Sequence, residues 1–156
     1  MQKTNVMRLL EQAGITYTAA EYKSDSGDNI GLHAAEALGL APELVFKTLV
    51  LQGAKKGPFV CCVPVSSELD LKRAAKAAGE KKADLLPLRD LTRITGYVRG
   101  GCSPIGMKKA YPTYIDETAL LHNAIVVNGG AVGCQITLSP AELIEFLKAE
   151  PVELCE

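Results

Sequence analysis

Tryptophan is absent from the sequence, and only two of its 156 residues are histidines. The five cysteines are an odd number and include no CxxC pair, so the spacing of a zinc site is missing. Cys61 and Cys62 lie within the apolar run FVCCVPV, where we expect them to be small, buried side chains of a strand. The sequence therefore predicts neither a bound metal nor another cofactor.

Long apolar segments are lacking as well. No run approaches the length that spans a bilayer, and the segment MQKTNVMRLLEQAG lacks the apolar core and cleavage site of a secretory signal. These absences predict a cytoplasmic protein that has no membrane partner.

An excess of positive charge is also missing, because 17 Lys and Arg residues face 18 Asp and Glu residues and the formal net charge is −1. This balance excludes the global basic field of non-specific nucleic-acid binding, so any contact with RNA must be local. The glycines follow neither the Walker pattern nor the dinucleotide fingerprint. What is present is a globular composition, 47% hydrophobic and 22% charged, and we expect one domain over residues 1–156.

Start and stop signals predict five helices. The clearest is the last, where Ser139, Pro140 and Glu142 form a capping box with proline at the first helical position. The segments between the helices are rich in β-formers, and several are separated by hairpin-length turns, which indicates an α+β fold with a mixed, partly barrel-like sheet flanked by helices. The expected helices cover residues 4–14, 32–39, 69–79, 86–96 and 139–149, the strands cover 15–22, 45–53, 55–65, 112–119, 123–130 and 134–138, and a polar loop covers 23–31.

Lys47 is the unusual residue of its strand, VFKTLVLQG. Strand alternation places it on the same face as Leu49 and Leu51, so that an ammonium group interrupts an apolar face. It is either a strand-end lysine that reaches solvent or a cation in the wall of a cleft, where it would bind a phosphate or polarise a carbonyl. The pattern alone favours neither.

Two glycine-rich loops each follow a predicted strand. Gly100 and Gly101 come after TGYVR, and the segment NGGAVG covers residues 128–133. Because glycine accepts positive φ, either loop can be a simple turn or can aim consecutive N–H groups at an oxyanion or a phosphate. Two such loops together with Lys47 make a binding pocket credible.

Other polar residues near these loops are weaker candidates. Cys102 and Ser103 are not part of a nucleophile elbow, and neither histidine is placed as their base. Tyr22 precedes the polar loop and is expected to be half-buried. Lys108 and Lys109 are either solvated or contact an RNA backbone.

The segments VFKTLVL, LDLKRAAKA, TGYVRGGCSPIGMKK, PTYID and VVNGGAVGCQITLSPAEL resemble the YbaK/EbsC family, free-standing relatives of the editing domain of bacterial prolyl-tRNA synthetases. These segments lie in order between about residues 15 and 148. The resemblance implies a mixed α+β fold and hydrolysis of the ester of mischarged Cys-tRNA(Pro), with tRNA as substrate and prolyl-tRNA synthetase as a partner. It also implies that the thiol of the substrate attacks its own ester, so that the protein supplies no nucleophile.

By position, the resemblance places the functional lysine on Lys47, backbone donors on Gly100 and Gly101, and the loop tyrosine on Tyr22. Lys108 and Lys109 are expected to contact the tRNA. Further substrate contacts are expected from Ile30, Thr48, Ser103, Pro104, Asn128, Gly129, Gly130 and Gln135.

Gln135 stands where some members of the family carry an acidic residue, so we expect it to form hydrogen bonds and not to act as a base. This departure leaves open the alternative that the protein is a non-catalytic accessory of a synthetase that binds tRNA or a nucleotide. Deacylation of Ala-tRNA(Pro), the activity of sister subfamilies, is the third alternative.

Overall fold

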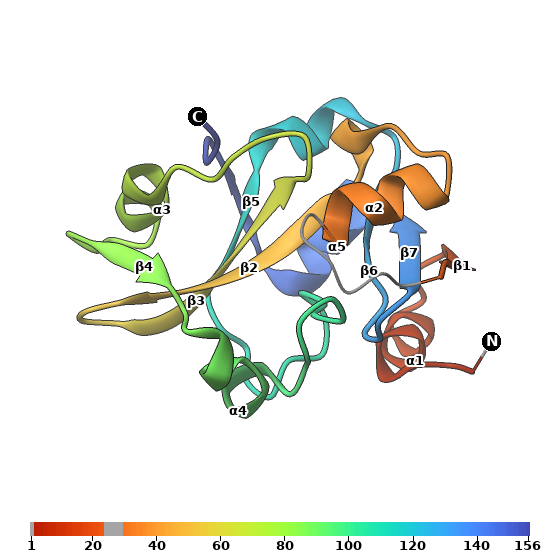
Figure 1. The fold of residues 1–156 in the computed structure, drawn as a ribbon, viewed down its shortest axis with the longest axis horizontal. Coiled ribbons are helices and arrows are strands. Elements are labelled where there is room, and N and C mark those ends of the chain that lie inside the picture. Colours follow the sequence, from red (N-terminus) through yellow and green to blue (C-terminus); the bar gives the residue numbers. More distant parts are fainter. Residues whose placement is uncertain (1, 24–29) are drawn as a thin grey trace.

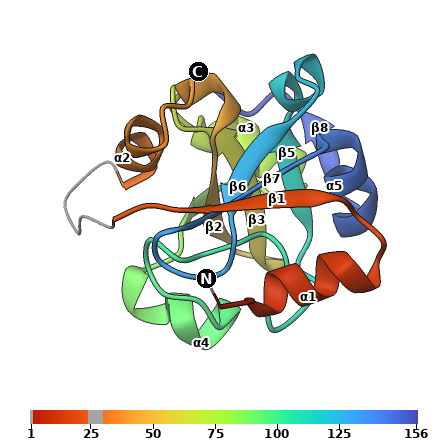
Figure 2. The same ribbon diagram turned by 90° about the vertical axis from the view of Figure 1, so that its right-hand side faces the viewer.

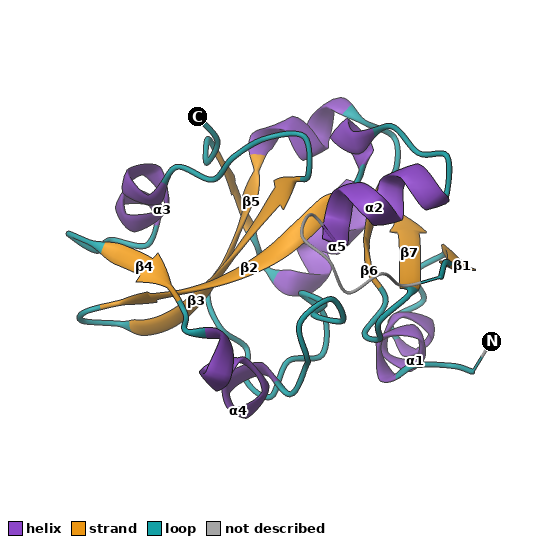
Figure 3. Cartoon of the chain, in the orientation of Figure 1, coloured by secondary structure: helices purple, strands orange, loops and turns teal. Residues whose placement is uncertain are grey.

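The structure, a computed structural model, describes residues 2–23 and 30–156, so most of the predicted polar loop lies outside the described residues. Within this part, eight strands form two sheets with helices around them (Figure 1; Figure 3). The predicted α+β class is confirmed. The five-stranded sheet has the order β4(Ala83–Leu85)–β2(Phe46–Gly53)–β3(Gly57–Pro64)–β5(Thr113–Asp116)–β8(Glu150–Val152), and the three-stranded sheet has the order β1(Tyr17–Glu21)–β7(Cys134–Leu138)–β6(Ile125–Asn128).

The five-stranded sheet is built on the predicted hairpin of β2 and β3. The two strands are antiparallel, and their register ends at the pair Gly53 and Gly57. The turn is held by Glu80, whose carboxylate accepts the backbone N–H groups of Lys55 and Lys56 at 3.2 and 2.7 Å. Because β5 and β8 add in parallel while β4 adds antiparallel to β2, the sheet is mixed, as predicted.

The three-stranded sheet packs across the other at one end of the hairpin (Figure 2). Its strands β6 and β7 lie within two predicted strands and pair as an antiparallel hairpin, and β1 pairs with β7. A parallel bridge between Val45 and Val126 connects the two sheets. The strands of the described residues thus form two joined sheets and not a closed barrel.

All five predicted helices are present, although the one expected over residues 32–39 covers Ile30–Ala37 and the one expected over residues 86–96 is divided into a short 3₁₀ helix and an α-helix. The hydroxyls of Thr4 and Ser139 accept N–H groups in the first turns of α1 and α5 at 3.3 Å. Gly96 ends α4 with φ of 88°, a left-handed conformation that glycine adopts without strain. The α-helices are α1(Asn5–Gln12), α2(Ile30–Ala37), α3(Leu71–Ala77), α4(Leu91–Thr95) and α5(Pro140–Leu147), and the short 3₁₀ helices are η1(Pro42–Leu44), η2(Leu88–Asp90) and η3(Glu117–Leu121).

The larger apolar core fills the space between the two sheets. Residues of α1, β6, β7 and α5 pack there against one face of the β2–β3 hairpin, represented by Phe46, Val60 and Cys62. The opposite face of the hairpin packs on α3. Both faces of β3 are therefore buried, which accounts for its nearly continuous apolar sequence.

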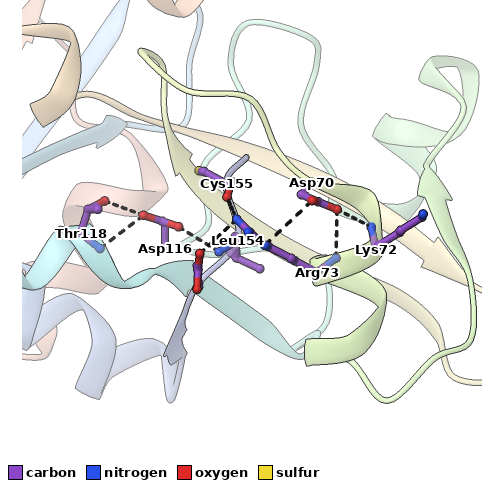
Figure 4. Close-up of polar contacts among 8 residues, drawn as sticks. Asp70, Lys72, Arg73, Asp116, Thr118, Leu154 and Cys155 are labelled. Carbon is purple, nitrogen blue, oxygen red and sulfur yellow. Dashed lines mark hydrogen bonds and ion pairs between the residues drawn. The ribbon is translucent and has the colours of Figure 1, made fainter.

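The C-terminal tail is fixed to the start of α3 and to the end of β5 (Figure 4). Leu154 donates its N–H to the Asp116 carboxylate at 2.9 Å and accepts the N–H of Asp70 at 2.8 Å. Asp70 also caps α3, and Arg73 bonds to the Cys155 carbonyl. The tail thereby connects the start of α3 with the end of β5, two segments that are far apart in sequence.

Candidate functional site

A cavity of about 370 Å³ opens along the first half of β2. β4 pairs with only Leu51–Gly53, which leaves the first half of β2, where the cavity lies, without a strand on that edge. The glycine loop at residues 99–102, together with β6 and β7, forms the opposite wall. The lining residues are Tyr22, Leu32, Val45, Phe46, Lys47, Thr48, Leu49, Val65, Glu68, Arg99, Gly100, Cys102, Asn128 and Gln135.

Lys47 lies in the wall of this cavity, half-buried. Its strand partner is Val63, and Leu49 on the same face packs into the apolar cluster beneath α3. No carboxylate of the described residues lies within ion-pair distance of its ammonium group. The apolar surroundings and the free ammonium favour a cation placed for a ligand over a strand-end lysine that only reaches solvent.

The glycine loop contributes backbone groups to the cavity. Gly100 has φ of 82°, and Asn128 fixes it by donating Nδ2 to the Gly100 carbonyl at 3.0 Å. The N–H groups of Gly100 and Cys102 have no hydrogen-bond partner among residues 2–23 and 30–156. Because both residues line the cavity, these N–H groups are candidate donors to an oxyanion.

Gly101 does not serve as a free donor, contrary to our expectation. Its N–H already donates to the Val98 carbonyl at 2.9 Å, and it does not line the cavity. Glycine is needed there for another reason, because a Cβ would lie 3.0 Å from the backbone nitrogen of Val132. Gly101 therefore allows the two glycine loops to pack against each other.

Two hydroxyls in the cavity wall are buried without a strong hydrogen-bond partner. The Tyr22 hydroxyl has no hydrogen-bond partner within the described part of the chain, and Thr48 Oγ1 has no partner other than the thiol of Cys62. Thr48 lies opposite Cys62 on β3, and a thiol is at best a weak donor. Because an unsatisfied buried polar group costs stability, both hydroxyls are suited to a polar ligand in the cavity.

Cys102 is present in the cavity as a neutral thiol. Burial raises its pKa to about 11, and a hydrogen bond with Thr95 offsets this only in part. At neutral pH the thiol is therefore protonated and a poor nucleophile. Burial likewise raises the pKa values of Cys61, to about 12, and of Cys62, which agrees with their expected structural role.

Not every expected contact residue lines the cavity. Asn128 and Gln135 do, whereas Ser103 is fully buried with its hydroxyl accepting the Ile105 N–H at 3.2 Å, and Pro104 lines a different groove. Gly129 and Gly130 permit close packing, since a Cβ on either would approach a neighbouring side chain to less than 3 Å.

The remaining expected residues are Lys108, Lys109 and Ile30. Lys108 and Lys109 are exposed outside the cavity, and Lys108 Nζ donates to the Arg93 carbonyl at 3.2 Å. Ile30 begins α2, but its side chain lies outside the described part of the structure.

The sequence reasoning missed two charged residues of the cavity, Glu68 and Arg99. Arg99 immediately precedes the glycine pair, so its proximity to Gly100 was a usable signal. Glu68 reaches the cavity only through the long-range fold, and its local sequence gives no such signal.

No group of three His, Cys, Asp or Glu side chains is placed to hold a metal ion within residues 2–23 and 30–156. In the same residues, no helix combines the length and apolar character needed to cross a membrane.

Comparisons with known proteins show the family of the chain. The family model of the aminoacyl-tRNA editing domain matches residues 32–146. The chain is 45% identical over 153 residues to the "Putative Cys-tRNA(Pro)/Cys-tRNA(Cys) deacylase EbsC" of Enterococcus faecalis, which covers 98% of this chain and 93% of that protein.

Two crystal structures have similar folds. One, of "a putative trans-editing enzyme for prolyl tRNA synthetase", has a TM-score of 0.85 at 25% identity and covers 100% of this chain and 99% of its own. The other, of a hypothetical protein, has a TM-score of 0.87 at 22% identity, with coverages of 98% and 100%. The chain therefore belongs to the aminoacyl-tRNA editing domain family.

Proposed function

We propose that residues 1–156 act as a single aminoacyl-tRNA deacylase domain that removes cysteine from mischarged Cys-tRNA(Pro) and from Cys-tRNA(Cys). The observation that carries this proposal is the cavity itself, which combines the free ammonium group of Lys47, two unpartnered N–H groups and a thiol kept neutral by burial. Membership in the editing family and the 45% identity to the Enterococcus protein support the substrate class.

The proposed mechanism uses the thiol of the substrate. Its sulfur attacks the ester carbonyl carbon, and the resulting oxyanion is stabilised by the N–H groups of Gly100 and Cys102 and by Lys47. The bond from the carbonyl carbon to the ribose 3′ oxygen then breaks, and the proton of the thiol ends on that oxygen. The products are tRNA with a free 3′ hydroxyl and a cyclic cysteine thiolactone, which water opens to cysteine.

This mechanism needs little from the protein beyond orientation. An intramolecular attack already has a high effective molarity, so the cavity has to hold a reactive geometry and stabilise developing charge. Lys47 either stabilises the oxyanion or binds the terminal phosphate, and the Tyr22 and Thr48 hydroxyls are available to the bound 3′ end. Alanine has no thiol, so its ester is spared.

The test is single-turnover deacylation of separately charged tRNAs by the wild-type protein. We expect rapid loss of cysteine from Cys-tRNA(Pro), and a much slower reaction with Ser-tRNA(Pro), because a hydroxyl is a poorer nucleophile than a thiol. Cys-tRNA(Cys) and Ala-tRNA(Pro) complete the series. Comparable rates for Cys-tRNA(Pro) and Ser-tRNA(Pro) would indicate that an activated water attacks the ester. A faster reaction with Ala-tRNA(Pro) would assign the activity of the sister subfamilies. Binding of the charged tRNAs without turnover would indicate a non-catalytic accessory.

The proposal also includes a partner protein and a cellular compartment. Prolyl-tRNA synthetase is the expected partner, because it generates the mischarged substrate, and the cytoplasm is the expected compartment for the same reason. A pull-down with the synthetase, with and without tRNA(Pro), measures whether the tRNA bridges the two proteins.

A further inference from the structure

Glu68 is the one acidic side chain among the residues that line the described cavity. It is exposed at the cavity rim and forms no ion pair with any described residue. The other charged groups of the lining, Lys47 and Arg99, are cations, while Asn128 and Gln135 are neutral. The cavity therefore presents negative charge at a single place.

The backbone at Glu68 is held in place by the C-terminal tail. The Glu68 carbonyl accepts the N–H of Glu156 at 3.0 Å, and two residues later Asp70 donates its N–H to Leu154 at 2.8 Å. Leu154 is in turn bound by the buried carboxylate of Asp116 (Figure 4). The side chain of Glu68 thus extends from a fixed backbone, which lowers the entropic cost of placing its carboxylate beside a ligand.

The substrate class of the proposed function carries one group that the mechanism leaves unused. Every aminoacyl ester has an α-amino group one carbon from the ester carbonyl, and its protonated form is a cation. The ammonium of Lys47 and the guanidinium of Arg99 repel that cation, whereas a carboxylate at the rim attracts it and forms charge-assisted hydrogen bonds.

We propose that Glu68 binds the α-ammonium group of the aminoacyl ester and thereby makes the site selective for tRNA that carries a free, unacylated amino acid. This inference rests on the proposed function and names a specificity-determining contact that its mechanism does not require. Lys47 and Glu68 then bind oppositely charged groups of one substrate. Lys47, on β2, binds the ester or phosphate oxygens, and Glu68, at the cavity rim, binds the α-ammonium group.

A binding measurement tests the contact without relying on turnover. The probes are 3′-cysteinylamino-3′-deoxyadenosine, in which an amide replaces the ester, and the same compound with an acetylated α-amino group. Titration calorimetry of the wild-type protein is expected to show about tenfold tighter binding of the free amine, the size of one moderate charged hydrogen bond. Glu68→Gln should bind the two probes about equally, and Glu68→Asp should retain part of the preference.

The matched control is Glu145→Gln, which removes the same charge from an exposed position on α5 outside the cavity. It should keep the wild-type preference for the free amine. If Glu68→Gln keeps that preference too, or weakens both probes equally, the contact does not exist.

A kinetic comparison separates this inference from the proposed function. Wild-type protein should deacylate Cys-tRNA(Pro) about tenfold faster, in kcat/KM, than N-acetyl-Cys-tRNA(Pro), and Glu68→Gln should lose activity on the first substrate only. If wild type and Glu68→Gln discriminate equally against the acetylated substrate, the role of Glu68 is refuted. The proposed deacylase activity is unaffected by that result. A wild-type protein that neither binds the probes nor deacylates Cys-tRNA(Pro) overturns both.

Discussion

Tyr22 and Thr48 place hydroxyl groups in the cavity wall, and among the described residues the Tyr22 hydroxyl has no hydrogen-bond partner while that of Thr48 has only the Cys62 thiol. Such groups lower the stability of the free protein, so their presence is understandable if a ligand satisfies them. Tyr22 is held firmly: its N–H donates to the Gly133 carbonyl at 2.9 Å, and its ring lies edge-on to that of His33. The hydroxyl therefore has a fixed position from which to meet a substrate.

We predict that Tyr22→Phe leaves the free energy of unfolding unchanged or raises it, while the rate of deacylation falls. The control is Tyr97→Phe, because the Tyr97 hydroxyl donates to the Ile105 carbonyl at 2.5 Å. Its loss should destabilise the fold by about 1 kcal/mol. Urea unfolding and single-turnover rates measure both effects, and a Tyr22→Phe protein that is less stable yet fully active would contradict this assignment.

Among the site residues, the sequence predicted those that the neighbouring sequence marks as unusual. Lys47 was visible because strand alternation marks a cation on an apolar face, and Gly100 because a glycine pair follows a strand. Glu68 was not predictable, since its place at the cavity depends on hydrogen bonds to the C-terminal tail. Gly101 was assigned the wrong task because a sequence does not show which N–H groups a turn already uses.

Among the elements, the short strands decide where the cavity lies. β4 has three residues and leaves part of the β2 edge unpaired, and the cavity lies along that part of β2. Neither β4 nor β8 was predicted, because three residues are too few to establish an alternating pattern. Pro151 further obscures β8, although proline is tolerated there since β8 is an edge strand. The helices and the β2–β3 hairpin were predictable from capping residues and turn glycines.

The C-terminal tail offers a prediction about pH. Burial alone would raise the pKa of Asp116, but hydrogen bonds from Thr118 and from the Leu154 N–H outweigh it and lower the pKa below its usual value of 3.8. The carboxylate therefore stabilises the fold in full above that value, and its contribution is lost as the pH falls through the lowered pKa. Asp116→Ala should cost about 2 kcal/mol at neutral pH, because buried N–H groups lose their acceptor.

Denaturant unfolding between neutral and acidic pH measures this contribution. The difference between wild type and Asp116→Ala should shrink as the pH falls below 3.8, whereas Asp84→Ala, at an exposed position of β4, should change little at any pH. A difference between wild type and Asp116→Ala that stays constant over the acidic range would show that the ionised carboxylate does not anchor the tail.

For the whole molecule, the net charge of −1 means that tRNA binding has to rely on local cations. The segment that carries Arg99 and Gly100 at the cavity continues to the exposed pair Lys108 and Lys109. Beyond it lies a second groove of about 430 Å³, lined by Lys109 and Lys148 and by no acidic residue. This segment thus carries cations both at the cavity and at the second groove.

We predict that Lys108→Glu with Lys109→Glu weakens tRNA binding and reduces its salt dependence, because each lost phosphate contact lowers the slope of log affinity against log salt by about one. Lys72→Glu with Lys76→Glu, two exposed positions of α3, changes the net charge equally and is the control. Filter binding at several salt concentrations gives the slopes. Equal losses in the two double variants would mean that the effect is one of net charge alone.

The central claim is that the cavity cleaves the ester with the Lys47 cation and without a nucleophile from the protein. Single-turnover deacylation of Cys-tRNA(Pro) by Lys47→Ala and Cys102→Ala, with circular dichroism to verify folding, tests it most directly. Lys47→Ala should lose about 3 kcal/mol of transition-state stabilisation, roughly a hundredfold in rate, while Cys102→Ala should react at nearly the wild-type rate. An active Lys47→Ala beside an inactive Cys102→Ala would contradict the account and assign the nucleophile to Cys102.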